Sequence, residues 1–178
     1  MSDQEDRAQD RAALLGAPRS PSRSGLAILA LDLATTTGWA AIDPQGRVTS
    51  GSQKFALAKG ETEGVRWMRF RKWIRTMLEL SGARLVAREQ MLLVALPGAA
   101  AKLAAGLHTV VEEEIAERGL EGSCVHAGTL KKWATGKGNA QKPAMIAEAE
   151  RRYGLEGLTH DQADALLILA WAREDAGA

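Results

Sequence analysis

The sequence is poor in cysteine and in aromatic residues. Of its 178 residues only one is a cysteine, Cys124, and Phe, Trp and Tyr together make up 4%. A single cysteine excludes an intramolecular disulfide and is typical of a reducing compartment. We therefore expect a cytoplasmic protein that is held together by packing rather than by covalent cross-links.

Long apolar runs and an excess of charge of one sign are also missing. No apolar stretch is long enough to span a bilayer, so we expect no membrane partner. The formal net charge is only +1, and any contact with nucleic acid would have to come from local basic patches. The hydrophobic content of 46% suits one domain of ordinary size.

The first residues do not have the basic start and apolar core of a signal peptide. Residues 1–24 are instead rich in charge, serine and proline, which predicts a disordered, solvated tail. Residues 25–175 would then form the folded domain.

The hydrophobic pattern predicts three strands in succession and then strands that alternate with helices. The predicted strands cover residues 26–33, 35–43, 47–57, 83–91 and 123–127. The predicted helices cover residues 61–80, 97–119, 128–134, 141–154 and 160–172. Thr159 and Gln162 have the spacing of a capping box at the start of the last helix. This order predicts an α/β fold, with a five-stranded mixed sheet flanked by helices.

Four carboxylates stand at the ends of predicted elements. Asp32 ends the first strand, Glu89 ends the fourth, and Asp161 and Asp164 lie three residues apart at the start of the last helix. Residues at this spacing share one helix face, and Asp164 directly precedes the apolar run of that helix. Like charges that lie together repel, and hard cations such as Mg²⁺ take oxygen ligands. The pattern therefore predicts an acidic metal site.

Each acid by itself also has a structural explanation. Asp161 in a first helical turn would interact favourably with the helix dipole without any metal. A glutamate at a strand end, such as Glu89, is often only a residue that faces a loop. The conjunction of the four acids, rather than any one of them, favours a site.

A basic segment, LKKWATGKGNAQK, precedes the last helix. Lys131, Lys132, Lys137 and Lys142 surround two glycines, which allow backbone N–H groups to approach phosphate closely. Lysines provide phosphate contacts that do not depend on base sequence. The segment predicts a DNA-backbone contact, with a solvated basic loop as the alternative. For the arginine-rich helix at 61–80, both DNA contact and a charged outer face stay open.

Over residues 26–173 the sequence resembles the RuvC-like Holliday junction resolvases of the RNase H-like superfamily. The resemblance rests on four segments in the same order: ALDLATTTGWA, VAREQ, LKKWATGKGNAQK and HDQADALLILA. It implies an RNase H-like fold and a homodimer. It also implies cleavage of both opposing strands of a four-way DNA junction, one strand per subunit, leaving 5′-phosphate ends.

The resemblance also implies the roles of individual residues. Asp32, Glu89, Asp161 and Asp164 would be the catalytic tetrad that binds two Mg²⁺ or Mn²⁺ ions, with Asp32 between the two. Such a pair of ions activates a water and stabilises the departing 3′ oxygen. By the same resemblance, two lysines of the basic segment, Lys131 and Lys142, would lie near the scissile phosphate.

The sequence departs from the family pattern at three positions. Ala34 stands where glycine is commoner, and Arg88 stands where an apolar or aromatic residue is commoner. Arg88 lies beside a predicted metal ligand, so we include it among the predicted DNA-binding residues, with a solvent-facing arginine as the alternative. His160 precedes the last pair of acids and is interpreted as a residue of the helix start.

Three other functions compete with this interpretation. The segment DLATTTG resembles the first phosphate loop of sugar kinases and actin-like ATPases, but 178 residues cannot hold the two domains of that class. A junction-binding protein without catalytic activity would be favoured by loss of an acid, and all four are present. The sequence does not distinguish a resolvase from a nuclease that acts more broadly on flaps and three-way branches.

Overall fold

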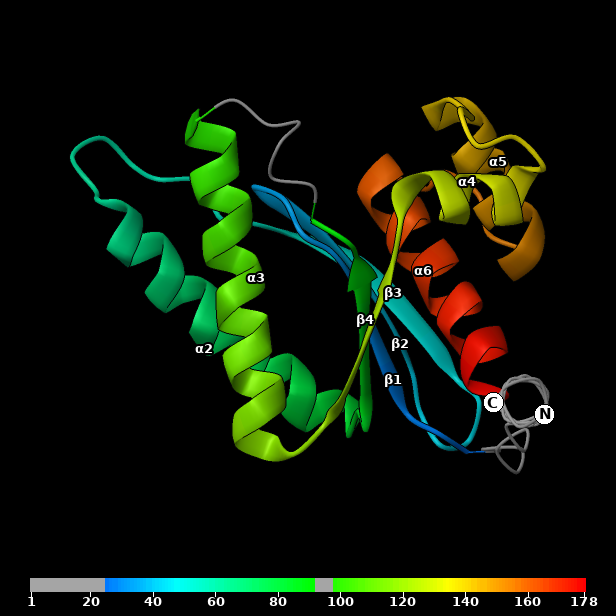
Figure 1. The fold of residues 1–178 in the computed structure, drawn as a ribbon, viewed down its shortest axis with the longest axis horizontal. Coiled ribbons are helices and arrows are strands. Elements are labelled where there is room, and N and C mark those ends of the chain that lie inside the picture. The colour runs from blue at the N-terminus through cyan, green and yellow to red at the C-terminus, as the bar shows by residue number, and fades with distance from the viewer. Residues whose placement is uncertain (1–24, 92–97) are drawn as a thin grey trace, which may run out of the picture.

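The computed structural model describes residues 25–91 and 98–178, which form one sheet with helices on both of its faces (Figure 1). The predicted tail at 1–24 lies outside the described residues. The strands are β1 (Ile28–Asp32), β2 (Thr36–Ile42), β3 (Val48–Lys54), β4 (Leu85–Glu89) and β5 (Glu121–Val125). The helices are α2 (Glu63–Ser81), α3 (Gly98–Arg118), α4 (Ala127–Thr135), α5 (Lys142–Tyr153) and α6 (His160–Ala176).

The five strands form a mixed sheet in the order β3-β2-β1-β4-β5. β2 pairs antiparallel with both β1 and β3, whereas β4 runs parallel to β1 and to β5. The predicted meander of three strands, followed by strands that alternate with helices, is therefore confirmed, as is the α/β class. β1 and β4 are central and parallel, so their carboxyl ends, Asp32 and Glu89, lie at the same edge of the sheet.

Side chains along the central strands alternate between two hydrophobic cores. Ile28 and Ala30 of β1 pack with buried residues of α5 and α6, such as Leu166. Leu29 and Leu31 pack on the other face with residues of α2 and α3, such as Phe70. The sheet is thus the middle layer of three (Figure 1). Helices α4, α5 and α6 lie on one side of it, and α2 and α3 lie on the other. This continuous burial explains why β1 is apolar at every position before Asp32.

Most element boundaries differ from the prediction by one to four residues, and β5 and α6 are two examples. β5 ends at Val125, two residues before the predicted end, because His126 is the N-cap of α4 and accepts a hydrogen bond from the Gly128 N–H on Nδ1 at 3.1 Å. α6 continues to Ala176, four residues beyond the predicted end. The capping box of Thr159 and Gln162 is confirmed. In the described part of the chain no helix is both long enough and apolar enough to cross a membrane.

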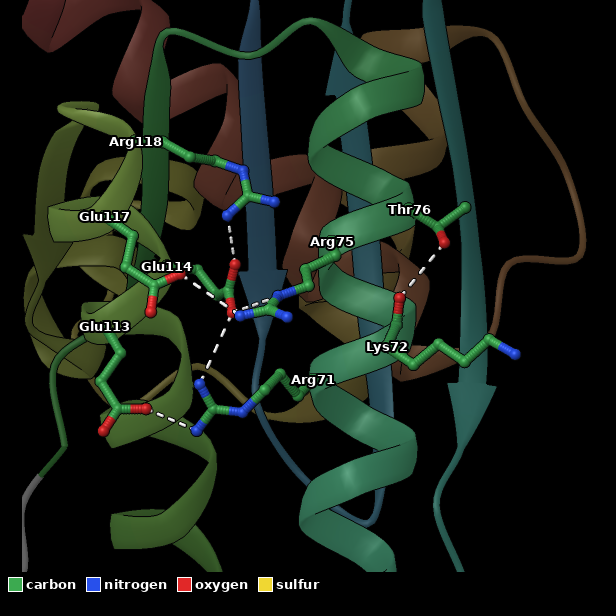
Figure 2. Close-up of polar contacts among 8 residues, drawn as sticks. All are labelled: Arg71, Lys72, Arg75, Thr76, Glu113, Glu114, Glu117 and Arg118. Carbon is green, nitrogen blue, oxygen red and sulfur yellow. Dashed lines mark hydrogen bonds and ion pairs between the residues drawn. The ribbon is translucent and has the colours of Figure 1, made fainter.

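The arginine-rich helix α2 is joined to α3 by ion pairs (Figure 2). Arg71 and Arg75 both contact Glu114 of α3, whose side chain is fully buried, and Arg118 contacts the same carboxylate from within α3. The other two α2 arginines pair with the acids before and at the start of the helix, Arg66 with Glu63 and Arg69 with Glu61. These ion pairs occupy the arginines of α2 within the fold, and contact of this helix with DNA stays a prediction.

Candidate active site

The first two acids leave the ends of adjacent parallel strands on the same face of the sheet. Ile28 and Ala30 of β1 face α6, and Asp32 continues this alternation. Leu85 and Ala87 of β4 face α6 as well, and Glu89 continues theirs. Asp32 and Glu89 therefore project beside one another at the carboxyl edge of the sheet, where both side chains are half-buried.

The second two acids reach this edge because α6 begins directly on the sheet. Gly38 pairs with Asp32 in the register of β1 and β2. A Cβ atom at position 38 would lie 1.9 Å from the carbonyl oxygen of Asp161, so only glycine leaves room for the start of α6. The capping box fixes the direction of the helix at the same point. Asp161 and Asp164, three residues apart, are thereby placed beside Asp32.

These side chains line one cleft with a volume of about 640 Å³. All four predicted acids belong to its lining, together with Lys131 of α4 and Lys142 of α5. The remaining lining residues are Ala34, Thr35, Thr36, Ala127, Ala140, Gln141, Met145 and His160. The structure thus collects residues from both ends of the described sequence, and from six secondary-structure elements, at a single cleft.

Burial and mutual repulsion raise the pKa values of three carboxyl groups in the cleft. Burial raises the pKa of Asp32 to about 8, and the negative charges of Asp164, Glu89 and Asp161 add to the shift. Burial, and then the charge of Asp164, raises the pKa of Glu89. Burial is also the main reason why the pKa of Asp164 is raised. Groups that resist losing their protons in this way are typical of functional sites.

Few hydrogen bonds compensate this arrangement. Within the described residues, the carboxylates of Asp32, Glu89 and Asp164 accept no hydrogen bond and form no ion pair, and only Asp161 has a close partner, the Nδ1 of His160 at 3.1 Å. Lys142 lowers the pKa of Asp32, and Lys131 lowers those of Glu89 and Asp164, without removing the net upward shifts. The cleft therefore holds acidic oxygen atoms that are free to bind a cation.

The donor set fits a hard divalent cation that keeps part of its water. In the described part of the chain no three His, Cys, Asp or Glu side chains already form a complete metal site. Mg²⁺ does not require one, because it is commonly bound by one or two carboxylates together with water and phosphate oxygens. Four unbonded or weakly bonded carboxylates around one cleft match that mode of binding, and soft or thiolate-binding metals do not fit them.

The basic segment enters the site only in part. Lys131 and Lys142 line the cleft, whereas Lys132 and Lys137 are exposed outside its lining. Residues i and i+1 on a helix point in different directions, which separates Lys131 from Lys132 on α4. Within the described residues none of the four lysines forms an ion pair, so all four stay predicted phosphate contacts, two of them inside the cleft.

Arg88 does not join the site, and its predicted contact with DNA beside the metals is wrong. It alternates with Glu89 and points to the opposite face of the sheet, where it is only 7% exposed. Its Nε donates a hydrogen bond to Nδ1 of His108 at 3.3 Å, and its terminal nitrogen pairs with Glu112 at 2.6 Å. Successive side chains of a strand point to opposite faces of the sheet. Arg88 therefore points away from the cleft although it is next to Glu89 in the sequence.

Sequence reasoning missed the threonines of the cleft as site residues. Thr35 and Thr36 line the cleft next to Asp32, and the hydroxyl of Thr37 donates to the carbonyl of Ala34 at 2.9 Å, which closes the turn between β1 and β2. Three successive threonines, which begin three residues after the strand-end acid Asp32, were the available signal. Their hydroxyls add neutral hydrogen-bonding groups to a site that is otherwise made of charges.

The arrangement of the sheet and of the closing helix defines the fold of this protein. Its mixed sheet, with carboxylates at the ends of two central parallel strands and a closing helix that adds two more, has the RNase H-like arrangement. Solved structures with this fold are found among the Holliday junction resolvases. The chain matches Thermus thermophilus RuvC with a TM-score of 0.68 at 18% identity, over 85% of this chain and 98% of that chain.

Two further structures agree with this match. T. thermophilus RuvC in complex with its Holliday junction substrate gives a TM-score of 0.69 at 18% identity, over 85% of this chain and 97% of that one. The yeast mitochondrial Holliday junction resolvase Ydc2 gives 0.59 at 14% identity, over 99% of this chain and 88% of that one. No protein-family model and no curated protein sequence matches. The resemblance to RuvC-like resolvases is thus confirmed at the level of the fold.

Proposed function

We propose that this protein is a metal-dependent endonuclease that cleaves four-way DNA junctions and leaves 5′-phosphate ends. The observation that carries the proposal is the cleft itself, where four carboxylates from β1, β4 and α6 meet two lysines from α4 and α5. Carboxylates bind the cations and lysines bind the phosphate, so the cleft has the two kinds of group that phosphodiester hydrolysis requires. The shared fold with RuvC supports the choice of a branched DNA substrate.

The residues of the cleft would divide the work between them. Asp32, Glu89, Asp161 and Asp164 would hold two Mg²⁺ or Mn²⁺ ions, which when bound supply the Lewis acid that activates water and neutralises charge on the leaving oxygen. Lys131 and Lys142 would contact the non-bridging oxygens of the scissile phosphate. His160 would keep the Asp161 carboxylate in place through the contact at 3.1 Å. Chemistry would thus be left to water, and the protein would supply position and charge.

The central prediction is that Asp32→Asn abolishes cleavage but preserves binding. The substitution keeps the size of the side chain and removes the charge that the cations need, so we expect the cleavage rate of a four-way junction in Mg²⁺ to fall by roughly a thousandfold or more. Binding of the junction, measured by fluorescence anisotropy, should stay the same or improve because a negative charge leaves the cleft. Absence of Mg²⁺-dependent cleavage by the wild-type protein would contradict the proposal.

The two alternative functions predict different results in the same assay. A broader debranching nuclease would cut flap and three-way substrates at rates comparable to the four-way junction. A junction-binding protein without activity would bind tightly and cut none of the three. Rates measured side by side on the three substrates, each with and without Mg²⁺, separate these possibilities.

A further inference from the structure

Positive charge without a partner is unevenly distributed over the described chain. The arginines of α2 are all in ion pairs with glutamates, and Figure 2 shows this for Arg71 and Arg75. They therefore offer little to a phosphate backbone. Lys54 is different: it is exposed, and within the described residues it forms no ion pair. It is the last residue of β3, an edge strand of the sheet, and the function proposed above makes no use of it.

The register of the sheet places Lys54 beside the cleft. Lys54 pairs with Thr36, a residue of the cleft lining, across β2 and β3. Directly paired residues have their side chains on the same face of a sheet. Thr36 is on the face of Ala40 and Ile42, which pack against α6, and this is also the face of Asp32. Lys54 therefore projects from the same face and the same edge of the sheet as the acids.

The backbone around Lys54 is held to the rim of the cleft. The next residue, Phe55, donates its N–H to the carbonyl of Thr35 at 2.7 Å, and Thr35 also lines the cleft. The Phe55 ring is buried against Phe70 and Trp73, with centroid distances of 5.1 and 5.3 Å. The lysine thus stands on a fixed base, although its own side chain is free to reach solvent.

Spacing and charge favour a DNA strand as the partner of this lysine. β3 is two strands from β1, which is about 10 Å at the usual distance between strands, or roughly three nucleotide steps along the axis of a DNA duplex. Lys131 reaches the cleft from α4, which follows β5 at the other edge of the sheet. Positive side chains therefore stand on both sides of the acids, as a strand passing across the cleft would require.

We propose that Lys54 is a DNA-binding residue that holds the backbone of the cleaved strand on the β3 side of the cleft, a few phosphates from the cut. This inference rests on the proposed function, because it requires branched DNA in the cleft. The competing explanation is that Lys54 only protects an exposed sheet edge from pairing with another chain, a common use of lysine on edge strands.

The first test compares Lys54→Gln with Lys72→Gln in an Asp32→Asn background. Lys72 is a matched control, because it is an exposed lysine of α2 without an ion pair in the described chain. We expect Lys54→Gln to weaken binding of a four-way junction about fivefold and to reduce the slope of log affinity against log salt by about 0.9. Lys54→Arg should restore both values, and Lys72→Gln should change neither.

The second test locates the contact on the DNA. A neutral methylphosphonate is placed at successive backbone positions of the junction, and binding is measured with and without Lys54→Gln. One position within about three nucleotides of the cut should weaken binding by the parent and have no further effect on the variant.

The two failures are distinguishable. Unchanged affinity and salt slope in Lys54→Gln, or an equal loss in Lys72→Gln, would overturn the role of Lys54 and leave the proposed function standing. A parent protein that binds no branched DNA would overturn both together.

Discussion

At the scale of single residues, Gly38 decides whether the acids can meet. Its Cα lies under the first turn of α6, and a methyl group there would overlap the carbonyl of Asp161. Backbone atoms on both sides of this contact leave no flexible side chain that could move aside. The glycine is needed for close approach, since its backbone is not in the left-handed region.

We predict that Gly38→Ala displaces α6 and disables the cleft. Relief of the overlap would move Asp161 and Asp164 away from Asp32, so cleavage should be lost and the free energy of unfolding should fall by about 1–3 kcal/mol. Gly64→Ala on α2 is the matched control, because the nearest atom to a Cβ there is the hydroxyl oxygen of Thr62, 3.6 Å away. It should be neutral or stabilising by up to about 1 kcal/mol. Denaturant unfolding and the cleavage assay test both, and normal cleavage by Gly38→Ala would contradict the close approach.

His108 is a second residue with a measurable consequence. Burial, and then the positive charge of Arg88, lowers the pKa of His108 from 6.5 to about 4, against a smaller opposite effect of Glu112. The folded protein therefore binds a proton at this histidine less readily than the unfolded chain. The contribution of His108 to stability is complete above pH 6.5 and is lost as the pH falls toward 4.

We predict that this loss reaches roughly 3 kcal/mol between pH 6.5 and 4. It is measured as the difference in free energy of unfolding between the wild type and His108→Gln across that range. The comparison with His108→Gln is needed because Asp32, whose pKa is raised to about 8, titrates over an overlapping range of pH. Its titration changes the free energy of unfolding in the opposite direction. Parallel curves for the two proteins would show that His108 takes up its proton as easily in the folded state as in the unfolded one.

At the scale of elements, α2 and α3 are joined by one buried carboxylate. Glu114 is 0% exposed and contacts Arg71, Arg75 and Arg118 (Figure 2). Its charge is tolerated in this position because three guanidinium groups surround it. Removal of that charge would leave the three arginines with partial burial and fewer partners, which costs more than the loss of a surface pair.

We predict that Glu114→Gln lowers the free energy of unfolding by about 2–4 kcal/mol. Glu113 is the control, because it pairs with Arg71 at 2.5 Å but its side chain is 48% exposed. Glu113→Gln should cost at most about 1 kcal/mol, as exposed ion pairs do. Urea unfolding measures both. Equal effects of the two substitutions would mean that burial of Glu114 adds nothing to the contact.

At the scale of the whole molecule, paired cleavage of a junction requires two active sites. One chain of 19.0 kDa has one such cleft among its described residues. The homodimer implied by the resemblance would provide the second site, with one subunit for each opposing strand.

We therefore predict a solution mass of twice 19.0 kDa, or 38.0 kDa, by light scattering. A cruciform plasmid should be linearised by two cuts within the lifetime of one complex. A mixture of wild type with excess Asp32→Asn should instead accumulate nicked circles, because most dimers that contain an active subunit would then contain only one. A monomer that still makes paired cuts would contradict this arrangement.

Much of this architecture follows from local pattern. Asp32 after an apolar run, the capping pair Thr159 and Gln162, and the glycines that end helices all act through neighbours in sequence, so the order and type of the elements could be predicted. The ends of helices such as α6 were predicted less accurately, because the last turns are held by contacts with the rest of the fold rather than by their own residues.

The sequence by itself determined the strands, the helices and the four acids, because hydrophobic period and residue type are written along the chain. Only the tertiary structure decided which side chains share a face. It turned Arg88 away from Glu89 and into a pair with Glu112, joined the α2 arginines to α3, and placed α6 on Gly38. The physical reason is that these contacts depend on register and crossing between segments far apart, which the local pattern does not contain.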